Sequence, residues 1–323
     1  MDERMIRKLQ RRDFSSIGWT LLVYSLIMTA CVMLAMTWDM IMISAGELAG
    51  NQYSDEEVAA ILMSNGWGYI LTIVIGLVIL RLWQGKQFCR ETLWTRGKPM
   101  TTGDFFCLLA LTLSAQLGFT LISGVLEALF NLFGLSLMES VESATMSADS
   151  FSMFLYMGVG APIAEELLFR GLVLRKLQPY GKRFAIVMSA LVFGLFHGNL
   201  VQIPYAFLVG LVLGYVALEY NILWAMVLHM INNLVLGDMV TRLTSGLPEF
   251  WYYGIIWAIV LASAAVTLVI CIVRHRDIRQ YRLENPIKGQ YAASFFTAPG
   301  VIALWIWVLI SVAIPIVSQI LES

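Results

Sequence analysis

Long apolar stretches recur along almost the whole sequence, and most are long enough to cross a lipid bilayer as a helix. They lie at about residues 17–38, 66–83, 104–135, 151–173, 184–199, 204–219, 222–240, 251–273 and 298–320. A transmembrane helix needs about 20 mainly apolar residues, and lipid favours helices because every backbone polar group must be satisfied internally. The sequence therefore predicts an all-α polytopic membrane helix bundle with about eight to nine transmembrane helices, forming one integral membrane domain over residues 1–323.

The composition excludes a soluble protein. The 323 residues are 59% hydrophobic and only 13% charged, whereas charged residues make up about a quarter of a soluble domain. The four cysteines form no C-x-x-C pair, which argues against a disulfide framework or a thiolate zinc site. We predict a multi-pass protein of the cell membrane whose partners are the lipid bilayer and molecules within it, not nucleic acid.

Positive charge is confined to alternate connections between the apolar stretches. Of the 21 Lys and Arg residues, all but Arg170 and Arg242 lie before residue 13 or within residues 81–98, 175–183 and 274–288. Cytoplasmic loops carry an excess of Lys and Arg. The pattern therefore predicts a cytoplasmic N-terminus.

Two adjacent glutamates and an arginine lie inside the fourth apolar stretch, at Glu165, Glu166 and Arg170. Ionisable groups at membrane depth are costly, and they are usually paired and functional. In a helix, Glu166 and Arg170 are i and i+4 neighbours that can neutralise each other. Glu165 is turned about 100° away and has no obvious partner, which suits a general base. The alternative is an ion pair beside a glutamate that only packs between helices.

Pro162 follows Gly158 and Gly160, just before the two glutamates. Proline removes a backbone donor from a helix and usually kinks or breaks it. We expect the helix to kink or restart here and to open a water-accessible cavity at membrane depth. The alternative is that these residues reflect only the usual frequency of Gly and Pro in membrane helices.

Two of the three histidines lie inside apolar stretches, each with a companion one helical turn away. Phe193 precedes His197, and Asn233 follows His229; His275 lies in a basic loop and is expected to be solvated. A single membrane histidine often serves only as a hydrogen-bond partner between helices. Two histidines, together with the glutamates and the carboxamide, are too costly a set to be explained easily by helix packing. They indicate a catalytic or transport site.

These residues resemble the three motifs of a known family of intramembrane proteases, the CPBP family (CAAX protease and bacteriocin-processing, also called ABI). The motifs are Glu165-Glu166-x-x-x-Arg170, Phe193-x-x-x-His197 and His229-x-x-x-Asn233, in the expected order and about 30 residues apart. The family includes the type II CAAX prenyl endopeptidases. The resemblance covers about residues 105–240, which would be the catalytic core, and the flanking transmembrane helices would be accessory.

The resemblance implies an endopeptidase that hydrolyses a membrane-embedded or lipid-anchored peptide or protein. Glu165 and His197 would polarise the attacking water, while His229 and Asn233 would donate hydrogen bonds to the oxyanion of the tetrahedral intermediate. Glu166, Arg170 and Phe193 would support them. We expect no cofactor. Zinc remains possible, because two histidines and a glutamate are a sufficient ligand set. The ligands would then be Glu165, or alternatively Glu166, with His197 and His229, although the paired H-E-x-x-H arrangement of zinc proteases is absent.

Two other classes of protein are consistent with part of this pattern. Some members of the family that this sequence resembles are thought to be non-catalytic membrane scaffolds or bacteriocin-immunity proteins. Such a scaffold does not need the full set of Glu165, His197, His229 and Asn233. A proton-coupled transporter can also use buried ionisable groups as a relay, but the sequence shows none of the internal repeats typical of many transporter folds.

Overall fold

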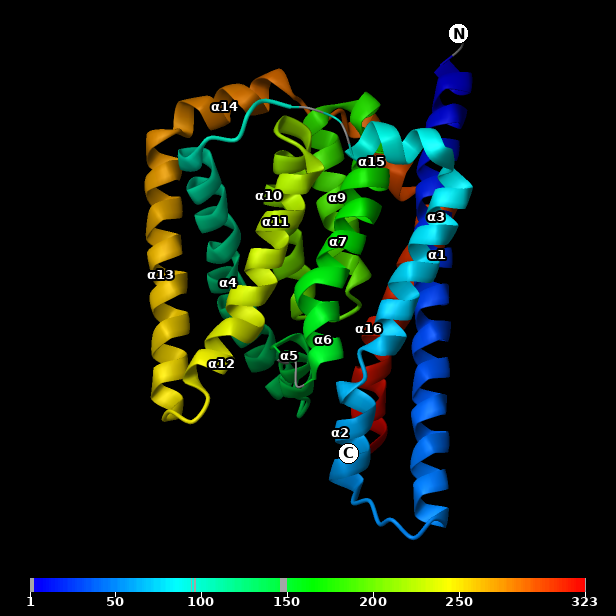
Figure 1. Ribbon diagram of the computed structural model, residues 1–323. Helices are drawn as coiled ribbons and strands as arrows, with labels where there is room; N and C mark the ends of the chain where they lie inside the picture. The colour runs from blue at the N-terminus through cyan, green and yellow to red at the C-terminus, as the bar shows by residue number, and fades with distance from the viewer. Residues whose placement is uncertain (1–2, 94, 96, 146–149, 323) are drawn as a thin grey trace.

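The computed structural model describes residues 3–322 apart from 94, 96 and 146–149, and this part of the chain contains helices and no strand. Figure 1 shows these helices standing side by side as a bundle. The prediction of an all-α membrane bundle is confirmed. The α-helices are α1 (Glu3–Leu48), α2 (Asp55–Ser64), α3 (Trp67–Leu93), α4 (Thr102–Asn131), α5 (Met138–Thr145), α6 (Phe151–Leu155), α7 (Ala161–Glu165), α8 (Leu174–Leu177), α9 (Lys182–Phe196), α10 (Gln202–Glu219), α11 (Ile222–Asn233), α12 (Val240–Thr244), α13 (Glu249–Val273), α14 (His275–Glu284), α15 (Gly289–Phe296) and α16 (Pro299–Glu322). Three π-helical segments, η1 (Tyr156–Gly160), η2 (Glu166–Val173) and η4 (Leu234–Met239), and one 3-10 segment, η3 (Gln178–Tyr180), join them.

Within the described residues, seven helices are long and apolar enough to cross a membrane. They correspond to seven of the nine predicted stretches. Of the other two, residues 151–173 are helical throughout but alternate between α and π geometry, and the stretch beginning near residue 184 forms α9, which has only 15 residues. The two stretches that depart from a regular span are therefore those that carry the glutamates and His197.

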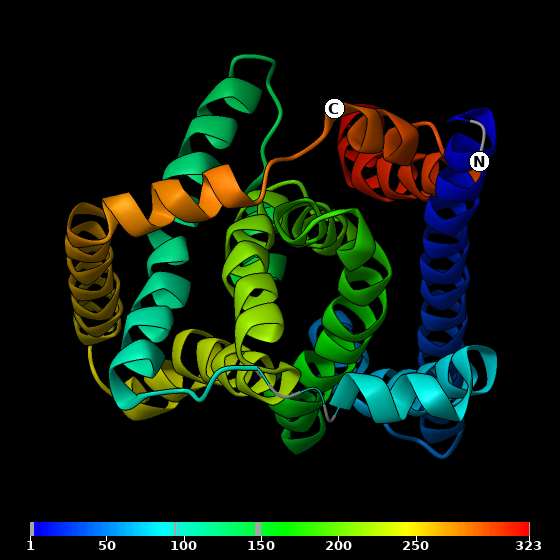
Figure 2. The same ribbon diagram turned by 90° about the horizontal axis from the view of Figure 1, so that it is seen from above.

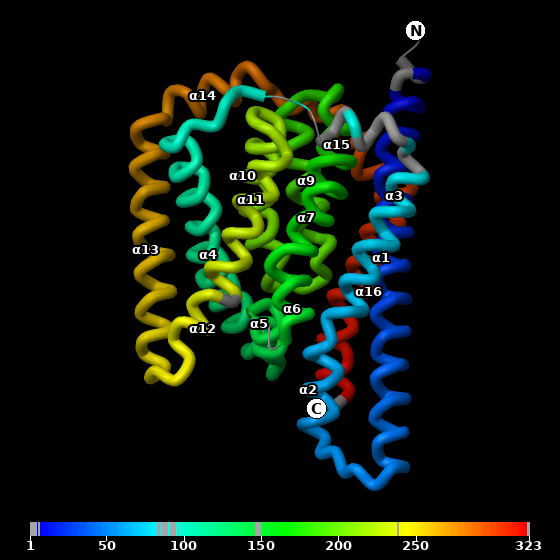
Figure 3. Tube along the Cα trace, in the orientation of Figure 1, coloured from blue at the N-terminus to red at the C-terminus, as the bar shows by residue number. Residues whose placement is uncertain are grey.

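The bundle has a central group of helices flanked by two outer groups. Helices α7, α9, α10 and α11 lie in the centre, α4 and α13 lie to one side, and α1, α3 and α16 lie to the other (Figure 1 and the tube view of Figure 3). Helix α10 packs against α9, α4 and α11, whereas α1 packs against α16 and α3. The view from above in Figure 2 shows the same separation, with α1 and α13 at opposite edges.

Small residues allow the central helices α9 and α10 to approach closely. A Cβ added to Gly194 would lie 2.7 Å from the carbonyl oxygen of Ile203, and one added to Gly210 would lie 3.0 Å from the Cβ of Ala190. Helix pairs in membranes associate through this kind of close backbone packing, because lipid supplies no hydrophobic driving force between helices. Because Gly210 has no side chain, its backbone carbonyl also stays open to a hydrogen bond from another helix.

Basic residues gather at one end of the bundle. The N-terminal part of α1, the connection from α8 to α9, and helices α14 and α15 all lie at the upper end in Figure 1, while α12, which carries Arg242, lies near the lower end. This segregation supports the predicted cytoplasmic N-terminus, which stays a prediction. The side chains of Lys86 and Arg96, which belong to the same charge pattern, lie outside the described residues.

Candidate active site

The helix that carries the glutamates is widened rather than broken. Pro162 has no N–H, and just before it the N–H of Ala161 bonds to the carbonyl of Tyr156, five residues back. The carbonyl of Met157 lies five residues before Pro162 and accepts instead from Nδ2 of Asn233, at 3.1 Å. The sequence predicted a kink or a restart of the helix here. At this place the structure has a π-helical turn and a side chain from α11, which together accommodate the proline. A cavity lies beside this part of the helix.

Glu166 is completely buried and is held by two cationic or potentially cationic side chains. Its Oε2 lies 3.2 Å from Nε of Arg170, which is also fully buried. Its Oε1 accepts from Nδ1 of His229 at 3.0 Å. The predicted ion pair between Glu166 and Arg170 is confirmed.

Arg170 makes two further contacts in the core. Its Nη2 donates to the carbonyl of Gly210 at 3.3 Å, and its guanidinium lies 4.4 Å from the centre of the Phe193 ring. A buried charge needs both pairing and hydrogen bonding. Arg170 therefore joins the helix of Glu166 to α9 and α10, as expected of a supporting residue.

Glu165 differs from Glu166 because it faces a cavity. Its side chain is 27% exposed, against 0% for Glu166, and its Oε2 lies 3.7 Å from Nε2 of His229. The sequence predicted no partner for Glu165. The structure corrects this, because His229 lies between the two glutamates. The local helical period could not predict this, because it depends on the packing of α11 against α7 and η2.

His197 lies at the end of α9, where Gly198 takes a left-handed conformation with φ +64°. Glycine is favoured there because other residues are strained at positive φ. The imidazole Nδ1 donates to the carbonyl of Phe193 at 2.9 Å, and in the neutral form of the ring this bond leaves Nε2 as an acceptor. The Phe193 ring meets the rings of both His197 and His229 edge to face, at 4.9 and 5.7 Å between centroids.

The structure adds two residues to this region that the sequence analysis missed, Asn232 and Tyr205. Nδ2 of Asn232 lies 2.7 Å from the hydroxyl of Tyr205 and 3.2 Å from Oδ1 of Asn233. Asn232 is 2% exposed. These contacts orient the carboxamide of Asn233. The sequence could have indicated Asn232, because its carboxamide lies in the same apolar stretch as that of Asn233 and is as costly to bury there.

A cavity of about 390 Å³ brings most of the predicted site residues together. Glu165, Phe193, His197, His229 and Asn233 all line it, whereas the fully buried Glu166 and Arg170 lie behind its wall. The outer helices α1 and α3 complete it with Tyr24 and Tyr69, and the Tyr69 ring stacks on Tyr156 with centroids 4.7 Å apart. The sequence analysis missed all three tyrosines. The further lining residues are Met28, Thr72, Ile73, Ser143, Met153, Met157, Ala161, Ala164, Leu168, Phe196, Gln202, Tyr205, Ala206, Val209 and Asn232.

The same side chains do not form a metal-binding group in this arrangement. In the described part of the chain, no three His, Cys, Asp or Glu side chains gather closely enough to hold a metal ion. A catalytic zinc ion takes three protein ligands and keeps a fourth position open. Glu165, His197 and His229 therefore do not fit a zinc shell as they stand.

Residues 147–235 match the model of one protein family, described as type II CAAX prenyl endopeptidase Rce1-like. This segment includes the widened helix and α11 and contains all three motifs. No curated protein and no solved structure matches the chain. Through these central helices the chain is similar to the type II CAAX prenyl endopeptidases, which belong to the CPBP family that the three motifs resemble.

Proposed function

We propose that the protein is an intramembrane endopeptidase that hydrolyses a peptide bond in a membrane-embedded or lipid-anchored substrate. The observation that carries this proposal is the difference between the two adjacent glutamates. Glu166 is fully buried between Arg170 and His229, while Glu165 faces the cavity together with His197. A carboxylate at the surface of a cavity can exchange a proton with water, whereas a carboxylate held between two partners serves the structure.

In the proposed reaction, Glu165 and His197 bind and orient a water molecule. As its oxygen forms a bond to the peptide carbonyl carbon, Glu165 accepts a proton from the water. The carbonyl oxygen becomes an oxyanion, which His229 and Asn233 stabilise. When the carbon–nitrogen bond breaks, the proton held by Glu165 passes to the leaving amine.

The contacts of His229 and Asn233 suit them to donate hydrogen bonds to the oxyanion. In its imidazolium form, His229 donates from Nδ1 to Glu166 and presents Nε2–H toward Glu165 and the cavity. Asn233 uses one amide hydrogen on the Met157 carbonyl and keeps the second for the oxyanion.

The cavity wall supports a peptide held within the membrane as the substrate. Besides the catalytic group, the lining consists mainly of aromatic, aliphatic and methionine side chains from the central helices and from α1 and α3. A volume of about 390 Å³ lies at the lower end of the usual range for ligand sites, about 300–1,000 Å³. We propose that it accommodates only a few residues of an extended peptide, with the rest of the substrate in lipid or at its surface.

His197→Ala is expected to abolish cleavage without unfolding the protein. The substitution removes the Nε2 acceptor beside the water and one bond to a backbone carbonyl. The assay uses purified protein in liposomes with a library of membrane-anchored peptides, and mass spectrometry detects the products. His275→Ala, which removes an exposed histidine on α14, is the matched control and should cleave like the wild type. Cleavage by His197→Ala at the wild-type rate would exclude His197 from the reaction.

We further propose that hydrolysis proceeds without a bound metal. Purified protein should then contain well below one zinc per chain, and 1,10-phenanthroline should inhibit no more than its non-chelating 1,7-isomer. Metal analysis by mass spectrometry and paired inhibition curves measure both quantities. Stoichiometric zinc that is lost together with activity in His197→Ala would overturn the metal-free mechanism and leave the peptidase proposal standing.

A further inference from the structure

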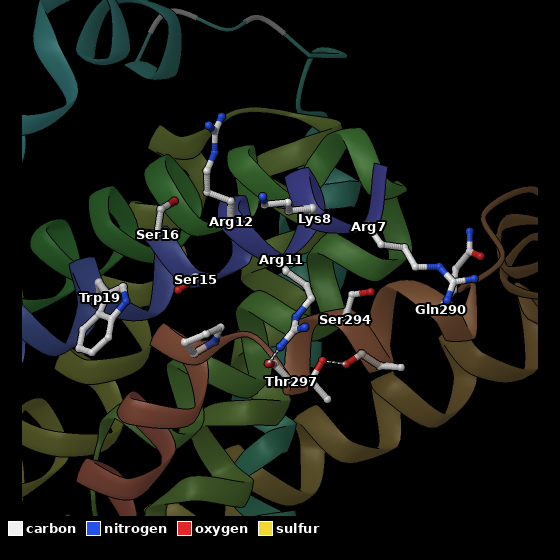
Figure 4. A pocket seen from close by; sticks show the side chains of 12 residues that line it. Arg7, Lys8, Arg11, Arg12, Ser15, Ser16, Trp19, Gln290, Ser294 and Thr297 are labelled. Atoms are coloured by element: carbon white, nitrogen blue, oxygen red, sulfur yellow. Dashed lines mark hydrogen bonds between the residues drawn. The ribbon is translucent and has the colours of Figure 1, made fainter. Parts of the chain in front are cut away.

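A second, larger pocket lies between the N-terminal part of α1 and the junction of α15 with α16 (Figure 4). It has a volume of about 920 Å³ and lies at the basic end of the bundle, away from the active-site cavity. Four cations of α1 line it, and no acidic side chain belongs to its described lining. The lining residues are Arg7, Lys8, Arg11, Arg12, Ser15, Ser16, Trp19, Gln290, Ala293, Ser294, Thr297 and Pro299.

Contacts between the two helices fix the walls of this pocket. Nη2 of Arg11 donates to the carbonyl of Thr297 at 2.8 Å, so Arg11 joins α1 to the end of α15. One turn further along α1, the N–H of Gly300 donates to Oγ of Ser15 at 2.9 Å. Gly18 meets the backbone of Gly300 so closely that neither position has room for a Cβ. These contacts hold α1 against the end of α15 and the start of α16 beside the pocket.

Apolar side chains continue from the pocket along both helices. On α1, Leu26 and Met33 follow Trp19 at seven-residue intervals, and all three are exposed. On α16, the exposed Ile302 and Ile306 follow the pocket residue Pro299 on the same face. Tryptophan is typical of the level where lipid headgroups meet acyl chains. The pocket thus combines a cationic upper part with an apolar surface that leads into the membrane.

We propose that this pocket binds the phosphate headgroup of an anionic phospholipid, whose acyl chains lie along the exposed faces of α1 and α16. Clustered Lys and Arg side chains attract anionic headgroups, and basic pockets between transmembrane helices bind them. Arginine also bonds phosphate oxygens with two parallel N–H groups. Gln290 and Ser294 supply further donors from α15. A lipid fits better than an acidic peptide because the apolar stripes continue for several turns below the cations.

The proposal is tested on purified, delipidated full-length protein by native mass spectrometry. Dioleoyl phosphatidylglycerol is titrated against dioleoyl phosphatidylcholine, which has the same chains and no net charge. The wild type should bind one molecule of phosphatidylglycerol in preference to phosphatidylcholine. Each basic residue near an anionic surface is worth about five-fold in affinity, so Lys8→Gln with Arg12→Gln should weaken this binding about 25-fold. Arg11 is left intact because it joins the two helices.

Matched controls distinguish binding in the pocket from attraction to the overall positive charge at this end of the bundle. Arg276→Gln with Arg279→Gln removes two exposed charges from α14 and should leave binding unchanged, as should the charge-conserving Lys8→Arg with Arg12→Lys. An equal loss in the α14 variant, or none in the pocket variant, would contradict the proposal. Displacement of the lipid by inorganic phosphate or soluble oligoglutamate as readily as by phosphatidylglycerol would show that the site takes free anions or peptides and overturn the lipid assignment.

Discussion

Glu165→Gln is expected to reduce peptide hydrolysis at least 100-fold while the protein stays folded. The substitution keeps the size of the side chain and its place at the cavity, but it removes the group that accepts the proton from water. A positioned general base typically contributes about 10²–10⁴-fold to a rate. Glu165 takes no part in the buried ion pair of Glu166 and Arg170, so thermal unfolding should change little.

The measurement is the cleavage rate in liposomes, together with the thermal unfolding of the same preparation. Glu56→Gln, which changes an exposed glutamate on α2, is the matched control and should retain the wild-type rate. Turnover by Glu165→Gln at that rate would refute the general-base role. A large loss of thermal stability along with activity would instead assign Glu165 to the packing of the helices.

Arg170→Ala should destabilise the protein by about 3–5 kcal/mol, because it leaves Glu166 as a buried charge without its cation. Both side chains are fully buried. The substitution also removes the hydrogen bond to the Gly210 carbonyl and the contact with the Phe193 ring. We expect lower expression, a lower unfolding temperature and, as a consequence, lower activity. Arg279→Ala, on the exposed face of α14, is the control that should leave all three unchanged.

A double-mutant cycle separates the two possible roles of Arg170. If the arginine mainly neutralises Glu166, the double variant Glu166→Gln with Arg170→Ala should be less destabilised than the sum of the single variants. Full thermal stability of Arg170→Ala with complete loss of activity would contradict the supporting role and make Arg170 a direct participant in the reaction.

The features that the sequence predicted well are those that depend on local spacing or on hydropathy. The helical bundle follows because lipid leaves an apolar chain few alternatives to the helix. The pair of Glu166 and Arg170 follows from the i, i+4 neighbourhood on one helix. For Pro162 the sequence predicted a kink or a restart of the helix, but it could not predict the π-helical turn before the proline or the bond from Asn233 to the Met157 carbonyl.

Contacts between distant segments could not be predicted in this way. His229 lies between both glutamates only because α11 packs against the widened helix. Tyr24 and Tyr69 reach the cavity because α1 and α3 close its outer side, beyond the family match of residues 147–235. Helix α1 also extends over 46 residues, well past its apolar run, since hydropathy marks the part of a helix in lipid and not where the helix ends.

The central claim is that Glu165 acts in the cleavage of membrane peptides, and it can be tested most directly in whole membranes, where the substrate need not be identified first. Membranes of cells that express either the wild type or Glu165→Gln at equal levels are compared by mass spectrometry for new peptide termini. We predict a defined set of termini in membrane proteins that appears with the wild type and is absent with Glu165→Gln. The same termini in both membranes, at equal abundance, would contradict the claim and favour a non-catalytic scaffold.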